Sequence, residues 1–204
     1  MGDVLRSTIE QLSIVLCLAL IFYFGSGRKK KGFFPWLGLY FPKNKEWIGN
    51  SILVLAVSTL VMAGPLLLFQ YFGYNISAMF YDEAISGRGL GINIVVIILL
   101  KALIQTALSE ELFFRGLIGK EIAGKFGYLA GNITQAVIFG LPHGLPLMIV
   151  YKEYSFGITL ILTAGIVGYF QFWLNEKKAD GSLLPSIIIH SIVNIVSFIT
   201  KALG

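Results

Sequence analysis

The chain has 204 residues, of which 56% are hydrophobic and 13% charged, with a mean hydropathy of +0.78 and a net charge of +5. This composition excludes a soluble globular domain and a disordered chain, and the apolar runs of spanning length indicate a polytopic membrane protein. The single cysteine, Cys17, excludes an intramolecular disulfide and a cysteine metal cluster. Because the basic residues flank apolar segments, the net charge indicates membrane topology rather than nucleic-acid binding.

The apolar segments predict an all-α fold: a transmembrane helix bundle of about six spans (between five and eight) in a single integral-membrane domain over residues 1–204. We expect the fourth span to be interrupted at Pro142, and residues 145–154 to form a re-entrant or interfacial piece. In chain order, the expected spans are residues 9–25, 47–72, 92 to about 120 or 125, 129–143, 156–174 and 183–202.

Lysine and arginine residues are unevenly divided between the two ends of this six-span arrangement. Ten lie in the loops at one end and four at the other, so we expect a multi-pass protein of the cell membrane with the more basic loops in the cytoplasm. Aromatic residues interspersed with basic ones over residues 28–47 predict contact with the headgroups of an anionic lipid leaflet. The ten are Arg28, Lys29, Lys30, Lys31, Lys43, Lys45, Lys120, Lys125, Lys177 and Lys178, and the four are Arg6, Arg88, Lys152 and Lys201.

The segment Glu110-Glu111-Leu112-Phe113-Phe114-Arg115 places three ionised side chains inside the long apolar helix. A charge at the bilayer centre costs about 2.5–3.5 kcal/mol on insertion scales, so such residues normally pair inside a bundle. At about 100° per residue, Glu111 and Arg115 lie on nearly the same helix face, whereas Glu110 points about 100° away. We therefore expect Glu111 to be paired and Glu110 to be free. Taken alone, the segment fits equally well with an ion pair that only holds helices together.

The only two histidines of the chain lie in or at the ends of apolar segments, in Phe139-Gly140-Leu141-Pro142-His143 and His190-Ser191-Ile192-Val193-Asn194. A helical hairpin turning near Gly127 brings Glu110 and His143 to nearly the same membrane depth, because similar lengths of helix lie on each side of the turn. His190 and Asn194 are one turn apart on one helix face and lie in the same zone. Each residue alone is explained by interhelical hydrogen bonding, but their convergence is not.

The succession Glu-Glu-x-x-x-Arg, Phe-x-x-x-His and His-x-x-x-Asn in successive apolar helices resembles the CAAX-protease and bacteriocin-processing family of intramembrane endopeptidases, also called the Abi family. The motif-bearing, CAAX-protease-like core covers about residues 92–203. The resemblance implies hydrolysis of a peptide bond in a hydrophobic peptide or a membrane-anchored protein. It also implies a link to bacteriocin or pheromone maturation or to self-immunity.

On this resemblance, Glu110 is the expected general base that activates water, and His143 shares or orients that water. His190 and Asn194 are suited to polarising the carbonyl and stabilising the oxyanion. Because the acidic pair and His190 lie nearer the end with the basic loops, we expect the site to open on the cytoplasmic side. The supporting residues are Glu111, Arg115 and Phe139.

The sequence does not decide between a metal-dependent and a metal-free mechanism. Glu110, His143 and His190 could hold a divalent metal such as zinc, but the compact His-Glu-x-x-His spacing is missing, and a metal-free mechanism is equally compatible. A non-catalytic membrane immunity or scaffolding protein that binds a peptide in the same cavity is the alternative function. An ion or proton pathway is a third, against which the lack of an inverted repeat counts.

Overall fold

The computed structural model describes residues 1–25 and 32–204, so the basic run from Arg28 to Lys31 lies outside the described residues. In the described part, six helices are long and apolar enough to cross a membrane, and no strand is present. This confirms the all-α, six-span prediction. The six spans are Gly2–Gly25, Glu46–Tyr71, Ile92–Phe126, Tyr128–Tyr151, Tyr154–Lys178 and Leu184–Leu203.

The third span is one continuous helix of 35 residues. It begins as α5 (Ile92–Leu99), continues through the π-helical segments η1 (Leu100–Leu108) and η2 (Glu111–Gly119), and ends as α6 (Lys120–Phe126). Glu110 lies at the junction of η1 and η2. π-Helical turns are rare and often occur at functional sites, because they displace the side chains that follow them. The other helices are α1 (Gly2–Gly25), α2 (Phe33–Leu37), α3 (Glu46–Tyr71), α4 (Ile76–Met79), α7 (Tyr128–Pro146), η3 (Leu147–Tyr151), α8 (Tyr154–Lys178) and α9 (Leu184–Leu203).

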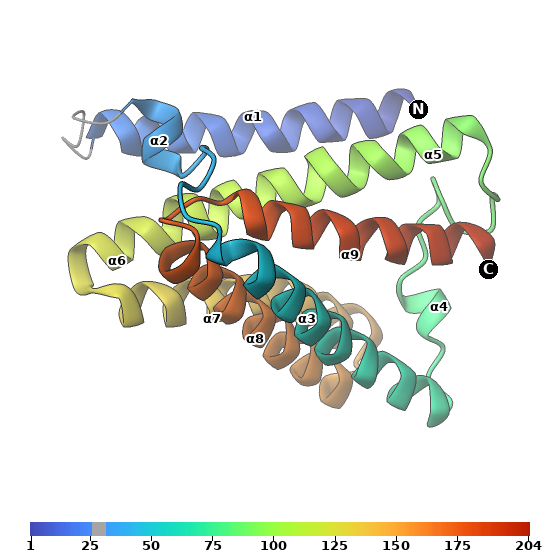
Figure 1. Ribbon diagram of the computed structural model, residues 1–204. Coiled ribbons are helices and arrows are strands. Elements are labelled where there is room, and N and C mark those ends of the chain that lie inside the picture. Colours follow the sequence, from blue (N-terminus) through green and yellow to red (C-terminus); the bar gives the residue numbers. More distant parts are fainter. Residues whose placement is uncertain (26–31) are drawn as a thin grey trace.

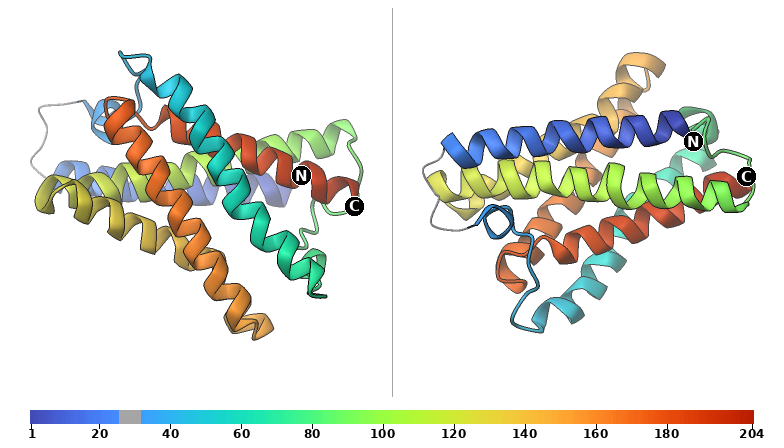
Figure 2. Two further views of the ribbon diagram at one scale, coloured as in Figure 1. Left: turned by 60° about the horizontal axis from the view of Figure 1, so that its bottom comes forward. Right: turned by 90° about the horizontal axis from the view of Figure 1, so that it is seen from above.

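The helices are arranged in two directions (Figures 1 and 2). Helix α1, the 92–126 helix and α9 lie side by side, and α3 and α8 cross them obliquely. Both chain termini lie at one end of the bundle, and the turn between α6 and α7 lies at the other (Figure 1). That turn contains Gly127 at φ 91°, as the hairpin prediction requires. Successive loops therefore lie at alternating ends of the bundle. This is the arrangement in which ten basic residues were counted at one end and four at the other.

Helix α7 does not break at Pro142. It continues through Pro142 and Pro146 and then as π-helical η3 to Tyr151, so the predicted interruption and the re-entrant piece are both wrong. The physical reason is that backbone groups in a membrane must be satisfied inside the segment, and proline is tolerated where a neighbouring helix and a local π-turn compensate. The chain leaves the helix only at Lys152, which has a left-handed backbone at φ 61°.

Close packing against α8 holds α7 in this position. A methyl group added at Gly140 would collide with the backbone oxygen of Ile161, and one added at Gly144 would collide with that of Gly157. Only glycine allows the two backbones to approach so closely, which is the usual device for helix association in lipid. This contact positions His143, which lies between the two glycines.

The end of the bundle with the basic loops is joined by hydrogen bonds. The Asp180 carboxylate accepts bonds from the backbone N–H groups of Lys43 (2.9 Å) and Asn44 (3.2 Å) and from the Asn44 side chain (2.6 Å). The bonds from Asn44 and then Lys43 hold the pKa of the Asp180 carboxyl below its usual value. Nearby, Lys120 bonds Glu176 at 2.6 Å and the backbone oxygen of Gly181 at 2.6 Å. These contacts connect the segment before α3 and the start of α6 to the α8–α9 turn.

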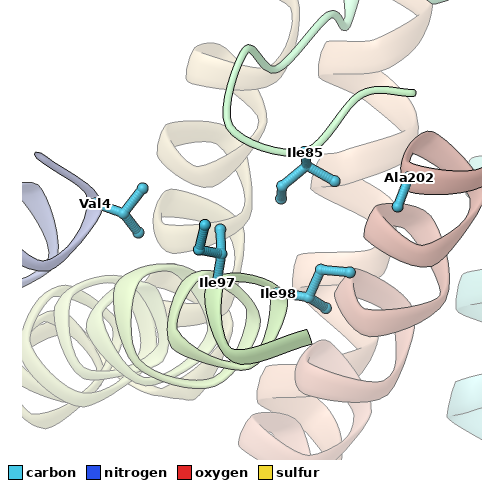
Figure 3. Close-up of a cluster of buried hydrophobic side chains, with 5 residues drawn as sticks. All are labelled: Val4, Ile85, Ile97, Ile98 and Ala202. Carbon is cyan, nitrogen blue, oxygen red and sulfur yellow. The ribbon is translucent and has the colours of Figure 1, made fainter. Parts of the chain in front are cut away.

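The opposite end is closed by an apolar cluster, shown in Figure 3. Ile85 of the 72–91 loop packs with residues of α1, α5 and α9. The same loop caps α9, because the N–H groups of Gly87 and Gly89 donate to the carbonyls of Lys201 (2.9 Å) and Ala202 (2.8 Å). The loop thus joins the end of α9 to α1 and to the start of the third span. The cluster consists of Val4, Ile85, Ile97, Ile98 and Ala202.

Candidate active site

Glu111 and Arg115 form the predicted ion pair one turn apart on η2. Arg115 Nη1 lies 3.2 Å from Glu111 Oε1, and both side chains are fully buried. On its other side, Arg115 Nη2 donates to Gln171 Oε1 of α8 at 2.7 Å. The guanidinium also lies 3.8 Å from the centroid of the Phe139 ring, which is cation–π geometry. The pair is therefore anchored to two further helices.

Gln171 is a site residue that sequence reasoning missed. The available signal was an amide side chain inside the apolar α8, three residues after Gly168. A methyl group added at Gly168 would lie 3.1 Å from Phe139 Cδ1 and 3.3 Å from Arg115 Nη2. Gly168 therefore makes room for the guanidinium between α7 and α8, and Gln171 binds it there.

His190 lies between the two adjacent glutamates. Its Nδ1 is 2.9 Å from Glu111 Oε1, and its Nε2 is 3.8 Å from Glu110 Oε2. The sequence prediction paired Glu111 with Arg115, and the bond from His190 to the same carboxylate was not predicted. The reason is geometric: the two carboxylates diverge from one helix, and an imidazole from α9 has a nitrogen for each. Because a carboxylate only accepts, the bond to Glu111 places a proton on Nδ1 when Glu111 is ionised.

Glu110 and His143 face the same cavity. It has a volume of about 330 Å³, and the side chain of Glu110 is 24% exposed. His143 Nδ1 lies 2.8 Å from the backbone oxygen of Phe139. Since a carbonyl only accepts hydrogen bonds, Nδ1 carries the proton, and Nε2 is the acceptor of the neutral ring. The cavity is lined by Gln11, Val15, Ser109, Glu110, Phe113, Phe114, Pro142 and His143.

Phe139 is the central aromatic side chain of the site, as well as a packing residue. Its ring is 3% exposed and lies 4.6 Å from that of His143, 6.0 Å from that of His190 and 5.2 Å from that of Phe114, centroid to centroid. The Arg115 guanidinium lies over the same ring. One rigid side chain therefore sets the spacing of both histidines and the arginine.

Asn194 lies apart from this group. Its Nδ2 donates to Thr106 Oγ1 at 2.6 Å, and Asn194 does not line the cavity that Glu110 and His143 share. The sequence prediction placed Asn194 together with the glutamates and histidines. In the structure it instead bonds Thr106 of η1. Thr106 was also missed. Its signal was a hydroxyl four residues before Glu110, and it donates in turn to the backbone oxygen of Lys101 at 2.9 Å.

The residues do not form a three-ligand metal site as they stand. In both histidines Nδ1 is hydrogen-bonded to an oxygen acceptor, of Phe139 for His143 and of Glu111 for His190. Histidines that bind a metal through the other nitrogen commonly have such a bond. Among the described residues, however, no three His, Cys, Asp or Glu side chains lie close enough together to hold a metal ion.

Comparison with protein families identifies the segment that carries the motifs. Residues 92–196 match the family model described as type II CAAX prenyl endopeptidase, Rce1-like. The matched segment is just over half of the chain, and it includes the Glu-Glu-x-x-x-Arg, Phe-x-x-x-His and His-x-x-x-Asn motifs. Comparisons with curated proteins and with solved structures gave no match.

Proposed function

Because the chain belongs to the Rce1-like type II CAAX prenyl endopeptidase family of intramembrane proteases, we propose that it hydrolyses peptide bonds in the membrane with Glu110 as the general base. One observation supports this choice above others. Glu110 faces a cavity together with His143 and accepts no hydrogen bond from any described residue. Its neighbour Glu111 is fully buried and is bound by Arg115 and His190. Of the two carboxylates, Glu110 is the one that can reach a water molecule.

In the proposed reaction, a water molecule binds in the cavity between Glu110 and His143. Glu110 removes one proton while the neutral Nε2 of His143 accepts a hydrogen bond from the other. The resulting hydroxide attacks the carbonyl carbon of the substrate. When the carbon–nitrogen bond breaks, Glu110 returns the proton to the leaving nitrogen, so the products are a carboxylic acid and an amine, which exchange a proton to become a carboxylate and an ammonium group.

His190 and Asn194 are proposed to stabilise the oxyanion. In this role His190 must carry a proton on Nε2 as well as on Nδ1, which Glu111 fixes, and this Nε2–H lies on the side of Glu110. An amide nitrogen carries two N–H groups, and Thr106 accepts a bond from one of those on Asn194. The second N–H is the one proposed to bind the oxyanion, which requires the substrate to extend from the cavity toward α9. Donors of this kind act by being fixed before charge develops.

The proposed substrate is a hydrophobic peptide or a membrane-anchored protein, the class that includes bacteriocin and pheromone precursors. We expect purified protein in lipid vesicles to cleave an apolar synthetic peptide or a prenylated CAAX peptide, but not a polar peptide of equal length. Mass spectrometry of the fragments identifies the bond. Parallel reactions contain a chelator or added zinc. Intact peptides under all of these conditions would contradict the proposal.

We further propose that the end with the basic loops is cytoplasmic, as the positive-inside rule predicts. Lys125 and Glu83 are exposed at opposite ends of the bundle. In a Cys17→Ser background, Lys125→Cys should be protected from an impermeant thiol reagent in intact cells, and Glu83→Cys should react. Both should react after permeabilisation, which is the control. The opposite labelling pattern would invert the orientation.

A further inference from the structure

Helix α1 lies outside the family-matched residues, yet it forms a wall of the cavity at Glu110. A second cavity, of about 420 Å³, adjoins the first because Gln11, Val15 and Phe113 line both. The two adjoining cavities lie beside α1 and are together called the α1 groove here. Its outer part is lined by Ser7, Glu10, Gln11, Ile14, Val15, Leu18 and Phe113.

The α1 groove combines apolar side chains with hydrogen-bond acceptors. Ile14 is 61% exposed at its rim. The Gln11 amide nitrogen donates to the backbone oxygen of Gln105 at 2.7 Å, which fixes the side chain, while its amide oxygen accepts no bond from the described residues. Glu10 adds a carboxylate that also contacts Arg6 at 2.8 Å. Acceptors next to apolar surface are therefore available along the route to Glu110.

This combination suits a peptide better than a hydrocarbon chain. An extended peptide in a membrane has N–H groups with no partner, each costing several kcal/mol if unsatisfied, and it needs acceptors beside the apolar surface that holds its side chains. A prenyl or acyl chain has no donor and gains nothing from them.

We propose that the α1 groove binds an extended apolar segment of the peptide substrate, with Gln11 as a positioning residue that accepts a hydrogen bond from a substrate N–H beside Glu110. The proposal rests on the proposed peptidase function, because the substrate is taken to lead toward Glu110, the proposed base at which the groove ends. Ile14 then borders the space for substrate side chains. Because α1 lies outside the matched segment, it can set the preference for substrate independently of the catalytic motifs.

A pair of tryptophan variants tests the groove by binding alone. The probe is a fluorescent, unprenylated peptide of leucine and alanine, and the protein is the full chain carrying Glu110→Gln in lipid vesicles. Ile14→Trp should fill the groove and weaken binding on the order of tenfold. Ile9→Trp is the matched control, because Ile9 is 56% exposed and lies about 140° around α1 from Ile14. It should leave the Kd unchanged.

Ester substitutions in the probe test Gln11 separately from any structural role. In a series of peptides, one amide at a time is replaced by an ester, which removes a single N–H donor. One position should weaken binding to the Glu110→Gln protein by up to about tenfold, the effect of one hydrogen bond. In protein that also carries Gln11→Leu, the ester at that position should have no further effect. A change in α1 packing alone would not remove the response to one ester.

Equal effects of the two tryptophans, or no effect of either, would overturn the proposal. So would an ester response that persists in Gln11→Leu, or displacement of the peptide from the groove by prenylcysteine alone. The outcomes also separate this proposal from the peptidase. Binding that responds to Ile14 without any turnover by the unaltered protein would retain the groove and reject the peptidase. Turnover by the unaltered protein, with binding that does not respond to Ile14→Trp, would retain the peptidase and reject the groove.

Discussion

Glu110→Gln is expected to lower the rate of peptide hydrolysis by about 10²- to 10⁴-fold, which is the usual contribution of a general base. An amide has nearly the shape of a carboxylate but cannot take a proton from water. Glu110 lines the cavity and accepts no hydrogen bond from the described residues, so the substitution should leave folding and peptide binding intact. The measurement is kcat in lipid vesicles, with melting temperature and peptide Kd recorded on the same preparation.

The matched control for this variant is Glu83→Gln. Glu83 is exposed in the 72–91 loop, and Arg88 bonds its backbone oxygen rather than its carboxylate. This variant should retain full activity. Full hydrolysis by Glu110→Gln would show that the base is elsewhere. If that variant loses hydrolysis but still confers immunity on cells, the binding function is the correct one for immunity.

Glu111→Gln is expected to destabilise the protein by on the order of 3–5 kcal/mol, the cost of leaving a buried charge without its partner. Arg115 is fully buried, and Glu111 is its only anionic contact within 4 Å among the described residues. The remaining bond to Gln171 is to a neutral amide and does not replace the lost charge. The expected signature is a low yield and an early melting transition in detergent.

A double variant and an exposed pair with the same spacing complete this test. Replacing Glu111 and Arg115 together with Leu and Met should recover part of the lost stability, because neither charge then remains buried alone. Arg6 and Glu10 form another i,i+4 pair, with side chains 78% and 58% exposed. Glu10→Gln should therefore leave the melting temperature unchanged. Equal melting temperatures of Glu111→Gln and the unaltered protein would contradict the buried-charge explanation.

The spans were predictable because the length and apolar content of a segment are local properties. The predicted helix from residue 92 to about 120 or 125 extends to Phe126, and the last span was placed within one residue of α9 at each end. Pro142 was misinterpreted for the opposite reason. Its effect depends on α8, whose backbone meets Gly140 and Gly144 and supports α7 through both prolines.

Within the candidate site, the Glu111–Arg115 pair could be predicted because both residues lie on one helix and its periodicity sets their faces. The sequence also identified the two histidines as unusual and placed them near the glutamates in depth. It did not determine their hydrogen bonds, which depend on how each helix is rotated about its axis.

Sequence alone thus determined the number and order of the spans, the local ion pair and the family motifs. Only the tertiary structure decided that His190 bonds Glu111, that Gln171 binds Arg115 and that α1 lines the cavity, since these contacts join residues 56 to more than 90 positions apart. The physical reason is that helix propensity and hydropathy act along one segment. Contacts between segments are set by crossing angles and by where glycine lets two backbones meet.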